Sequence, residues 1–259
     1  MPEILIGLAA MVAVATAIRS IWSPCGLSML STITPMAEAT RGHRFASTAR
    51  WFVLGSVVGG ATLGVVIAGL VLAVNAIGIG EETSLVVAAL AALITATSDG
   101  RIGGFRLPGH DRQVNERWLD RYRSWVYGAG FGWQIGVGLA TYIMTAGIYL
   151  LIVMGALLVN PLLAVGIGVL FGLVRGLAVY MAAELDTQQK LVGFHARFEE
   201  KRELVRRTTI VVQALVAVAA IWTATSLVTA VAVSALALAV VVVSLRGPKE
   251  TLGPAVAWS

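Results

Sequence analysis

The apolar stretch Thr208–Leu245 constrains the fold of this 259-residue chain more than any other feature. Its 38 residues would form a helix of about 57 Å at a rise of about 1.5 Å per residue, but the hydrocarbon core of a bilayer is only about 30 Å thick. We therefore expect two membrane-spanning helices here, separated by a turn near Ala224–Thr229. One long last helix is the alternative, and it would make the whole chain a six-span protein.

The composition places the whole chain in the membrane. Hydrophobic residues make up 58% and charged residues 13% of the sequence, and the mean hydropathy is +0.84. Soluble domains carry about 25% charged residues, so this chain has too few polar side chains to cover a soluble surface. Soluble enzymes, nucleic-acid-binding domains and disordered proteins are excluded. We expect an all-α polytopic membrane protein whose partner is the lipid bilayer and not nucleic acid.

Five further apolar stretches bring the expected number of transmembrane helices to about seven. They are Ile4 to about Met36, Trp51–Ile77, Ser84–Thr97, Val126–Val159 and Leu162–Ala183. The first is too long for one straight helix, and it is interrupted at Ser23-Pro24. We expect a first three-helix repeat at 1–98, then a cytoplasmic loop with an interfacial helix at 99–125. A second repeat follows at 126–227, with a cytoplasmic helical extension at 187–207, and a final helix and tail occupy 228–259.

The basic residues give the expected orientation. Of the 19 Lys and Arg residues, 17 lie in alternate connections or after the last span; the other two, Arg19 and Arg175, lie inside spans. Basic loops stay on the cytoplasmic side of a membrane. The pattern therefore predicts a multi-pass protein of a bacterial-type cytoplasmic membrane, with its N-terminus outside and its C-terminus inside.

Two segments of the chain suggest an internal repeat. Trp22-Ser23-Pro24-Cys25-Gly26 in span one and Gly132-Trp133-Gln134-Ile135-Gly136 in span four align with an offset of 110 residues. Three spans precede the second copy, so the repeat is inverted, an arrangement common in transporters. Spans two, four and five also carry stacked glycines. Such glycines let helix backbones approach closely in lipid, so we expect Gly59 and Gly172 at helix–helix contacts.

These segments resemble the CcdA/DsbD transmembrane thiol-electron carriers of cytochrome c biogenesis, which belong with the LysE-type exporters in one broad superfamily. The resemblance covers about Ile4–Met181. It implies a reactive cysteine in each repeat and exchange with a thioredoxin-like or membrane protein partner. Ser23-Pro24-Cys25 matches the first cysteine site. Gly132-Trp133-Gln134-Ile135-Gly136 lacks both the proline and the cysteine of the second, so an internal disulfide cannot form.

The candidate site is centred on Cys25, the one cysteine of the chain. Pro24 has no N–H and should break span one, which places Cys25 at the start of a half-helix whose dipole favours a thiolate. Alternatively, Cys25 packs as a small hydrophobe. We expect the remaining site-forming residues to be Arg19, Trp22, Ser23, Pro24, Trp133, Gln134 and Arg175.

The two arginines inside spans are costly to bury. Arg19 lies one turn before the expected break, where it could bind freed carbonyls, an anion or a thiolate. Both arginines could instead snorkel to the cytoplasmic face. The expected spans contain no carboxylate to pair with either of them.

Three functions remain open at this point. They are a degenerate thiol-redox membrane protein that uses Cys25 with a partner's thiol, a small-solute exporter with an anion near Arg19, and a non-catalytic subunit of a membrane complex. The sequence has no phosphate loop, hydrolase motif or short metal-ligand spacing. We therefore expect no cofactor, no metal and no enzyme of these classes.

Overall fold

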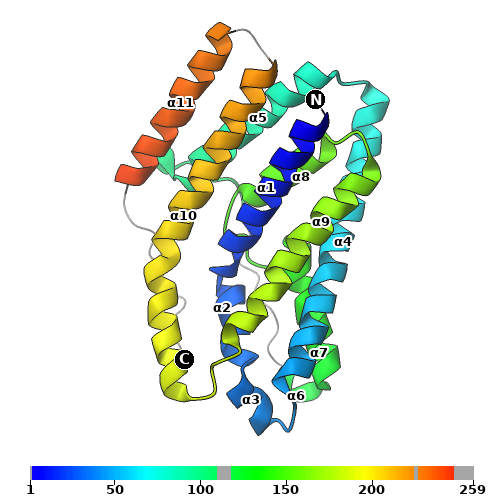
Figure 1. Ribbon diagram of the computed structural model, residues 1–259, viewed down its shortest axis with the longest axis vertical. Coiled ribbons are helices and arrows are strands. Elements are labelled where there is room, and N and C mark those ends of the chain that lie inside the picture. The colour runs from blue at the N-terminus through cyan, green and yellow to red at the C-terminus, as the bar shows by residue number, and fades with distance from the viewer. Residues whose placement is uncertain (1, 110–117, 225–226, 248–259) are drawn as a thin grey trace.

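A computed structural model describes residues 2–109, 118–224 and 227–247, and this part of the chain is all-α. Figure 1 shows its helices, most of which run along the long axis of the molecule. They are α1 (Pro2–Ile21), α2 (Pro24–Thr32), α3 (Pro35–Thr40), α4 (Phe45–Ile77), α5 (Glu81–Asp99), α6 (Trp118–Arg121), α7 (Ser124–Val137), α8 (Gly147–Ala156), α9 (Pro161–Leu177), α10 (Gln188–Ala224) and α11 (Leu227–Arg246). Two 3₁₀ turns, η1 (Ile102–Gly104) and η2 (Ala178–Ala182), follow α5 and α9.

Six helices of the described chain are long and apolar enough to cross a membrane: α1, α4, α5, α9 with η2, α10 and α11. The predicted all-α polytopic fold is therefore confirmed. The division of the chain into two repeats with domain boundaries at 98, 125 and 227 stays a prediction.

The first span breaks where the sequence predicts. α1 ends at Ile21 and α2 begins at Pro24, with Trp22 and Ser23 between them. Ser23 has an extended backbone, and its hydroxyl accepts a 3.2 Å hydrogen bond from the N–H of Gly26. Proline is well placed in the first helical turn because no N–H is needed there. Serine and proline together thus end one half-helix and start the next.

The expectation of one long fourth span is wrong. Val126–Val159 forms two shorter helices, α7 and α8, separated by the nonhelical segment 138–146. Gly138 ends α7 with a φ of +73°, a conformation that L side chains rarely adopt. The segment is apolar and has no proline, so its composition does not predict a break in the helix. Spans one and four occupy corresponding positions in the two copies of the proposed repeat, and both are discontinuous.

The last apolar stretch divides as predicted. α10 ends at Ala224 and α11 begins at Leu227, so the model with one long last helix is wrong. α10 is continuous from Gln188, and the predicted cytoplasmic extension at 187–207 is thus the first half of the same helix as span six.

Glycines bring three helices into backbone contact. A Cβ on Gly172 of α9 would lie 2.2 Å from the carbonyl oxygen of Ser56 in α4. A Cβ on Gly59 of α4 would lie 2.3 Å from the carbonyl oxygen of Trp133 in α7. The Ser56 hydroxyl also donates a 2.7 Å hydrogen bond to the carbonyl oxygen of Gly172. The predicted packing roles of Gly59 and Gly172 are confirmed, and α4 is the helix that joins α7 to α9.

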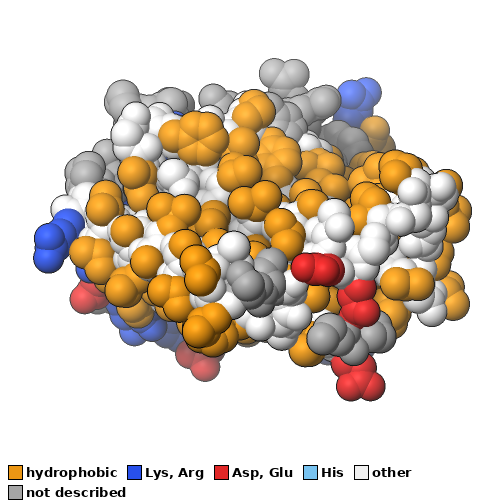
Figure 2. All heavy atoms as spheres, turned by 90° about the horizontal axis from the view of Figure 1, so that it is seen from above, with side chains coloured by type: hydrophobic (Ala, Val, Ile, Leu, Met, Phe, Trp, Pro, Cys, Tyr) orange, Lys and Arg blue, Asp and Glu red, His pale blue; other side chains and the backbone are white. Residues whose placement is uncertain are grey.

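Figure 2 looks onto the end of the molecule that carries the N-terminus. Apolar side chains cover most of this face, acidic groups project from it, and Lys and Arg appear only at its rim. Glu81 and Glu82, at the start of α5, are exposed. This distribution is compatible with the orientation predicted from the basic loops, in which this end lies outside.

Candidate functional site

Cys25 lies in the first turn of α2, directly after the break in span one. Cys25 is 1% exposed, and its sulfur is not part of a disulfide. Gly26 makes the break possible, because a Cβ there would lie 2.0 Å from the carbonyl oxygen of Ile21. The sequence therefore fixes Cys25 at the positive end of a half-helix in the protein interior.

Arg175 of α9 places a cation in the same region of the protein interior. It is 2% exposed, and its guanidinium interacts electrostatically with Cys25. Its Nη1 donates a 2.6 Å hydrogen bond to the carbonyl oxygen of Ile135, and the guanidinium also lies 5.5 Å from the centre of the Phe171 ring. Arg175 thus connects Cys25 to Ile135, the residue that aligns with Cys25 in the proposed repeat. It does not snorkel to the surface.

Two residues of α10, one helical turn apart, cover the break. The Trp22 ring stacks on Phe198 with centroids 4.3 Å apart, and its Nε1 donates a 2.8 Å hydrogen bond to the Phe198 carbonyl oxygen. Arg202 Nη1 lies 3.3 Å from the Trp22 carbonyl oxygen and donates to it. A carbonyl freed by a break needs such a partner away from water. Arg202 supplies it to Trp22.

The structure does not bring Trp133 to Cys25. The Trp133 side chain is 42% exposed, and its Nε1 donates a 3.2 Å hydrogen bond to the Thr62 hydroxyl on α4. Gln134 is half-buried. Of the residues predicted for the second half of the site, Arg175 alone is shown to interact with Cys25 in the described chain.

Arg19 lies in a different place, on the wall of a polar cavity of about 330 Å³. It is 3% exposed and interacts electrostatically with Asp99, the last residue of α5. Arg101, Arg106 and Arg206 line the same cavity. The expectation that no carboxylate lies in a span is therefore wrong: α5 extends two residues beyond Thr97 and so includes Asp99.

Asp99 holds the start of α8. Its carboxylate accepts hydrogen bonds of 2.7 Å from the N–H of Ala146, 2.5 Å from the Thr145 hydroxyl and 2.8 Å from Nε2 of Gln213. These contacts join α5, α10 and the break in span four. A buried helix start needs acceptors for its free N–H groups, and Asp99 provides one.

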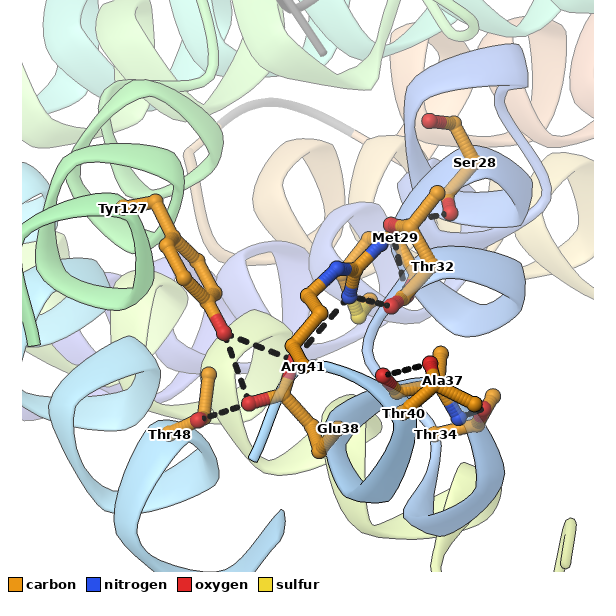
Figure 3. Close-up of polar contacts among 10 residues, drawn as sticks. All are labelled: Ser28, Met29, Thr32, Thr34, Ala37, Glu38, Thr40, Arg41, Thr48 and Tyr127. Atoms are coloured by element: carbon orange, nitrogen blue, oxygen red, sulfur yellow. Dashed lines mark hydrogen bonds and ion pairs between the residues drawn. The ribbon is translucent and has the colours of Figure 1, made fainter. Parts of the chain in front are cut away.

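A second buried carboxylate, Glu38 of α3, ties the loop after span one to α4 and α7 (Figure 3). It is fully buried. The Tyr127 hydroxyl lies 2.8 and 2.7 Å from its two oxygens, and the Thr48 hydroxyl donates to Oε2. Arg41 Nη1 lies 3.2 Å from Oε1 and also donates a 2.9 Å hydrogen bond to the Thr32 carbonyl oxygen. These contacts join α3, α4 and α7 around one buried carboxylate.

Sequence reasoning missed Glu38, Asp99 and Arg202 because each lies at or beyond the edge of an expected span. A signal existed for Glu38: Thr34-Pro35 followed by Glu38 is the start pattern of a short helix, and the Thr34 hydroxyl does cap α3. Nothing local marks Asp99 or Arg202 as buried. Among the described residues, no group of three His, Cys, Asp or Glu side chains is placed to hold a metal ion.

Comparison with known proteins gives one set of relatives. The chain is 29% identical over 207 residues to the methylamine utilization protein MauF of Paracoccus versutus, which covers 76% of this chain and 72% of that protein. It is 29% identical over 199 residues to the MauF of Paracoccus denitrificans, covering 74% and 69%. It is 32% identical over 158 residues to the MauF of Methylobacillus flagellatus, covering 56% and 52%.

No protein-family model and no solved structure matches the chain. The chain is thus a multi-pass integral membrane protein that is distantly related to bacterial MauF proteins.

Proposed function

We propose that this chain is a CcdA/DsbD-like membrane protein that exchanges thiols and disulfides with thioredoxin-like partners through Cys25 alone. The observation that carries the proposal is the placement of Cys25: a buried thiol at the start of half-helix α2 that interacts electrostatically with the Arg175 guanidinium. The thiolate is the reactive form of a cysteine in such an exchange.

The exchange needs two dithiol partners, because the chain has one cysteine. The Cys25 thiolate attacks the disulfide of the first partner, forms a mixed disulfide and releases one partner sulfur as a thiolate. A thiolate of the second, reduced partner attacks the Cys25 sulfur, and the first partner leaves as a dithiol. The remaining thiol of the second partner then attacks and frees Cys25. Two electrons pass from the second partner to the first, and Cys25 returns unchanged.

We expect that a partner can reach Cys25 only when Phe198 and Arg202 of α10, which cover the break in span one, move away. Phe198 and Arg202 hold Trp22 over the break, and these are the contacts that must open for a partner to reach the thiol. The relatives are named for methylamine utilization, and we place the proposed exchange in that process.

Trapping of the mixed disulfide tests the proposal. Full-length protein in native membranes is incubated with a thioredoxin-like protein whose resolving cysteine is replaced by serine, and adducts are separated on a non-reducing gel. We expect an adduct with the parent chain, a weaker one with Arg175→Gln and none with Cys25→Ser. An adduct that persists in Cys25→Ser, or none in the parent even with Phe198→Ala to open the cover, would reject the proposal.

A small-solute exporter is the second candidate function, and the polar cavity beside Arg19 is the observation that favours it. Discontinuous spans at such a cavity are found in transporters. Efflux of a radiolabelled anion from loaded proteoliposomes tests transport directly. Efflux that is equal in liposomes with and without the protein would exclude the anion from its substrates.

A further inference from the structure

A basic hollow lies on the surface at the start of α4, at the end of the molecule opposite the N-terminus (Figure 1). Arg44 and Arg50 line this hollow, and both are exposed. Its volume is about 620 Å³, and its other lining residues are Ala46, Ser47, Trp51 and Leu54. No acidic side chain is among the described residues that line it. We call this place the α4 hollow.

The guanidinium groups of Arg44 and Arg50 are available to a ligand. Neither forms an ion pair or a side-chain hydrogen bond in the part of the chain that the structure describes. Arg41, three residues before Arg44, is by contrast paired with the buried Glu38 at 3.2 Å. Guanidinium groups bind phosphate oxygens in pairs through two parallel N–H groups. The α4 hollow therefore offers two such groups to a phosphate.

Two exposed tryptophans lie beside these arginines. Trp51 of α4 and Trp125 in the first turn of α7 have ring centroids 6.0 Å apart, and they are 42% and 51% exposed. The two helices pack closely here, because a Cβ on Gly128 of α7 would lie 3.0 Å from the carbonyl oxygen of Thr48. Tryptophan is enriched where a membrane protein crosses from the lipid chains to the headgroups. The ring pair therefore marks the headgroup level.

Beyond Trp51 the same side of α4 is apolar. Leu54, Val58 and Val65 are 54%, 58% and 62% exposed, and their spacing from Trp51 keeps them on one face of the helix. α4 has 33 residues, which gives a length of about 50 Å at about 1.5 Å per residue, against a hydrocarbon core of about 30 Å. The apolar run begins at Trp51, so the turns before it extend into the headgroup region.

We propose that the α4 hollow binds one anionic phospholipid. Arg44 and Arg50 hold its phosphate, Trp51 and Trp125 flank the headgroup, and its acyl chains lie along the exposed apolar face of α4. Basic residues beside a span attract anionic lipid. A soluble phosphate would leave the apolar face unused, and a zwitterionic lipid would bring a second cation to the two arginines. The inference does not depend on the proposed thiol exchange.

The test follows the melting temperature of the full chain in mixed micelles of detergent and phosphatidylcholine, titrated with phosphatidylglycerol at constant total lipid and salt. We expect saturable stabilisation by phosphatidylglycerol. The double variant Arg44→Gln/Arg50→Gln should need about tenfold more of this lipid for half of the effect, because each basic residue near an anionic headgroup favours it several-fold. Arg50→Gln alone should act in the same direction, and it tests the site if the double variant fails to fold.

Arg197→Gln/Arg246→Gln is the matched control. It removes two charges from exposed positions that do not line the hollow, and Arg246 also lies at the end of a span, α11. This variant should respond to phosphatidylglycerol like the parent. sn-Glycerol 3-phosphate, which carries a phosphate without acyl chains, should give no stabilisation at the same concentration.

Three results would overturn the proposal. Equal stabilisation by phosphatidylcholine and phosphatidylglycerol would show that the hollow does not select an anionic headgroup. Equal weakening in the two double variants would show a general attraction of charges instead of a site. Stabilisation by sn-glycerol 3-phosphate that matches that of the lipid would identify a soluble anion as the occupant.

Discussion

The carboxylate of Asp99 accepts a 2.7 Å hydrogen bond from the backbone N–H of Ala146, and this contact fixes the point where α8 begins. The two residues are 47 positions apart in the chain. Asp99 ends the third span, and Ala146 ends the nonhelical segment within the fourth. A nonhelical segment at membrane depth is tolerated only where the protein satisfies its backbone, so Asp99 is a condition for the break in span four.

Replacement of Asp99 by alanine should destabilise the protein by about 1–3 kcal/mol, because the start of α8, the Thr145 hydroxyl and the Gln213 amide each lose an acceptor. The melting temperature in detergent measures the change. Asp186→Ala is the control, since Asp186 is an exposed residue paired with Lys190 at 2.8 Å. Equal melting temperatures for Asp99→Ala and the parent would contradict the capping role.

Gly172→Leu should destabilise the bundle by about 3 kcal/mol or more, because even its Cβ would meet the backbone of α4 at 2.2 Å. Gly166→Leu makes the same change on the same helix, at an exposed position where a Cβ meets nothing within 4 Å. Thermal unfolding in detergent should therefore separate the two variants widely. Similar melting temperatures would show that α4 and α9 do not depend on this close approach.

These contacts show which parts of the structure could be predicted from the sequence. Pro24 lacks an N–H and lies beside a capping serine, so the break in span one can be predicted from the local sequence. The glycines of α4 and α9 follow a helical spacing that has one common cause, close packing. The break at 138–146 has no such local mark. It depends on Asp99, 47 residues from Ala146 in the chain, and a contact of that kind appears only once the helices are placed.

The same reason explains the unexpected role of Arg202. Its charge and its neighbours Glu199 and Glu203 are typical of a solvated helix face, and Glu199 does lie 2.8 Å from its Nε. Its burial at 2% exposure follows from the tertiary contact with Trp22. Local sequence thus predicted the helix but not which of its sides meets the break.

Tyr127→Phe should destabilise the protein by about 1–3 kcal/mol, because it removes the hydroxyl that donates to the buried Glu38 carboxylate. The hydrogen bonds lie between α3 and α7, so the loop after span one should also become more open to protease. Tyr180→Phe, at a tyrosine that is 43% exposed, controls for the loss of a hydroxyl. Unchanged melting and proteolysis in Tyr127→Phe would show that Glu38 is held without this tyrosine.

The orientation of the chain predicts the activity of fused reporters. Because 17 basic residues lie in alternate connections or after the last span, we predict that the C-terminus is cytoplasmic. A C-terminal green fluorescent protein should then be fluorescent, and a C-terminal alkaline phosphatase inactive. Fusion of the phosphatase after Gly78, between α4 and α5, should give the opposite result. An active phosphatase at the C-terminus would reverse the orientation or change the number of spans.

The relation between Cys25, Arg175 and Ile135 allows the missing half of the thiol pair to be restored. Arg175 donates a 2.6 Å hydrogen bond to the carbonyl oxygen of Ile135 and interacts electrostatically with Cys25. Ile135 is 2% exposed and belongs to the same apolar cluster as Leu27 of α2. Its position is also the one that aligns with Cys25 in the proposed repeat.

Ile135→Cys should therefore form a disulfide with Cys25 under mild oxidation, seen as a faster band on a non-reducing gel that disappears with reductant. Addition of Gln134→Pro, which restores the Pro-Cys order, should raise the yield if the two half-helices are equivalent. The band must be absent when Cys25→Ser is combined with Ile135→Cys. Trp133→Cys on the same helix points outward at 42% exposure and should form none. Because a disulfide requires Cα atoms within about 7 Å, equal yields from positions 133 and 135, or none from 135, would reject the equivalence of Ile135 and Cys25.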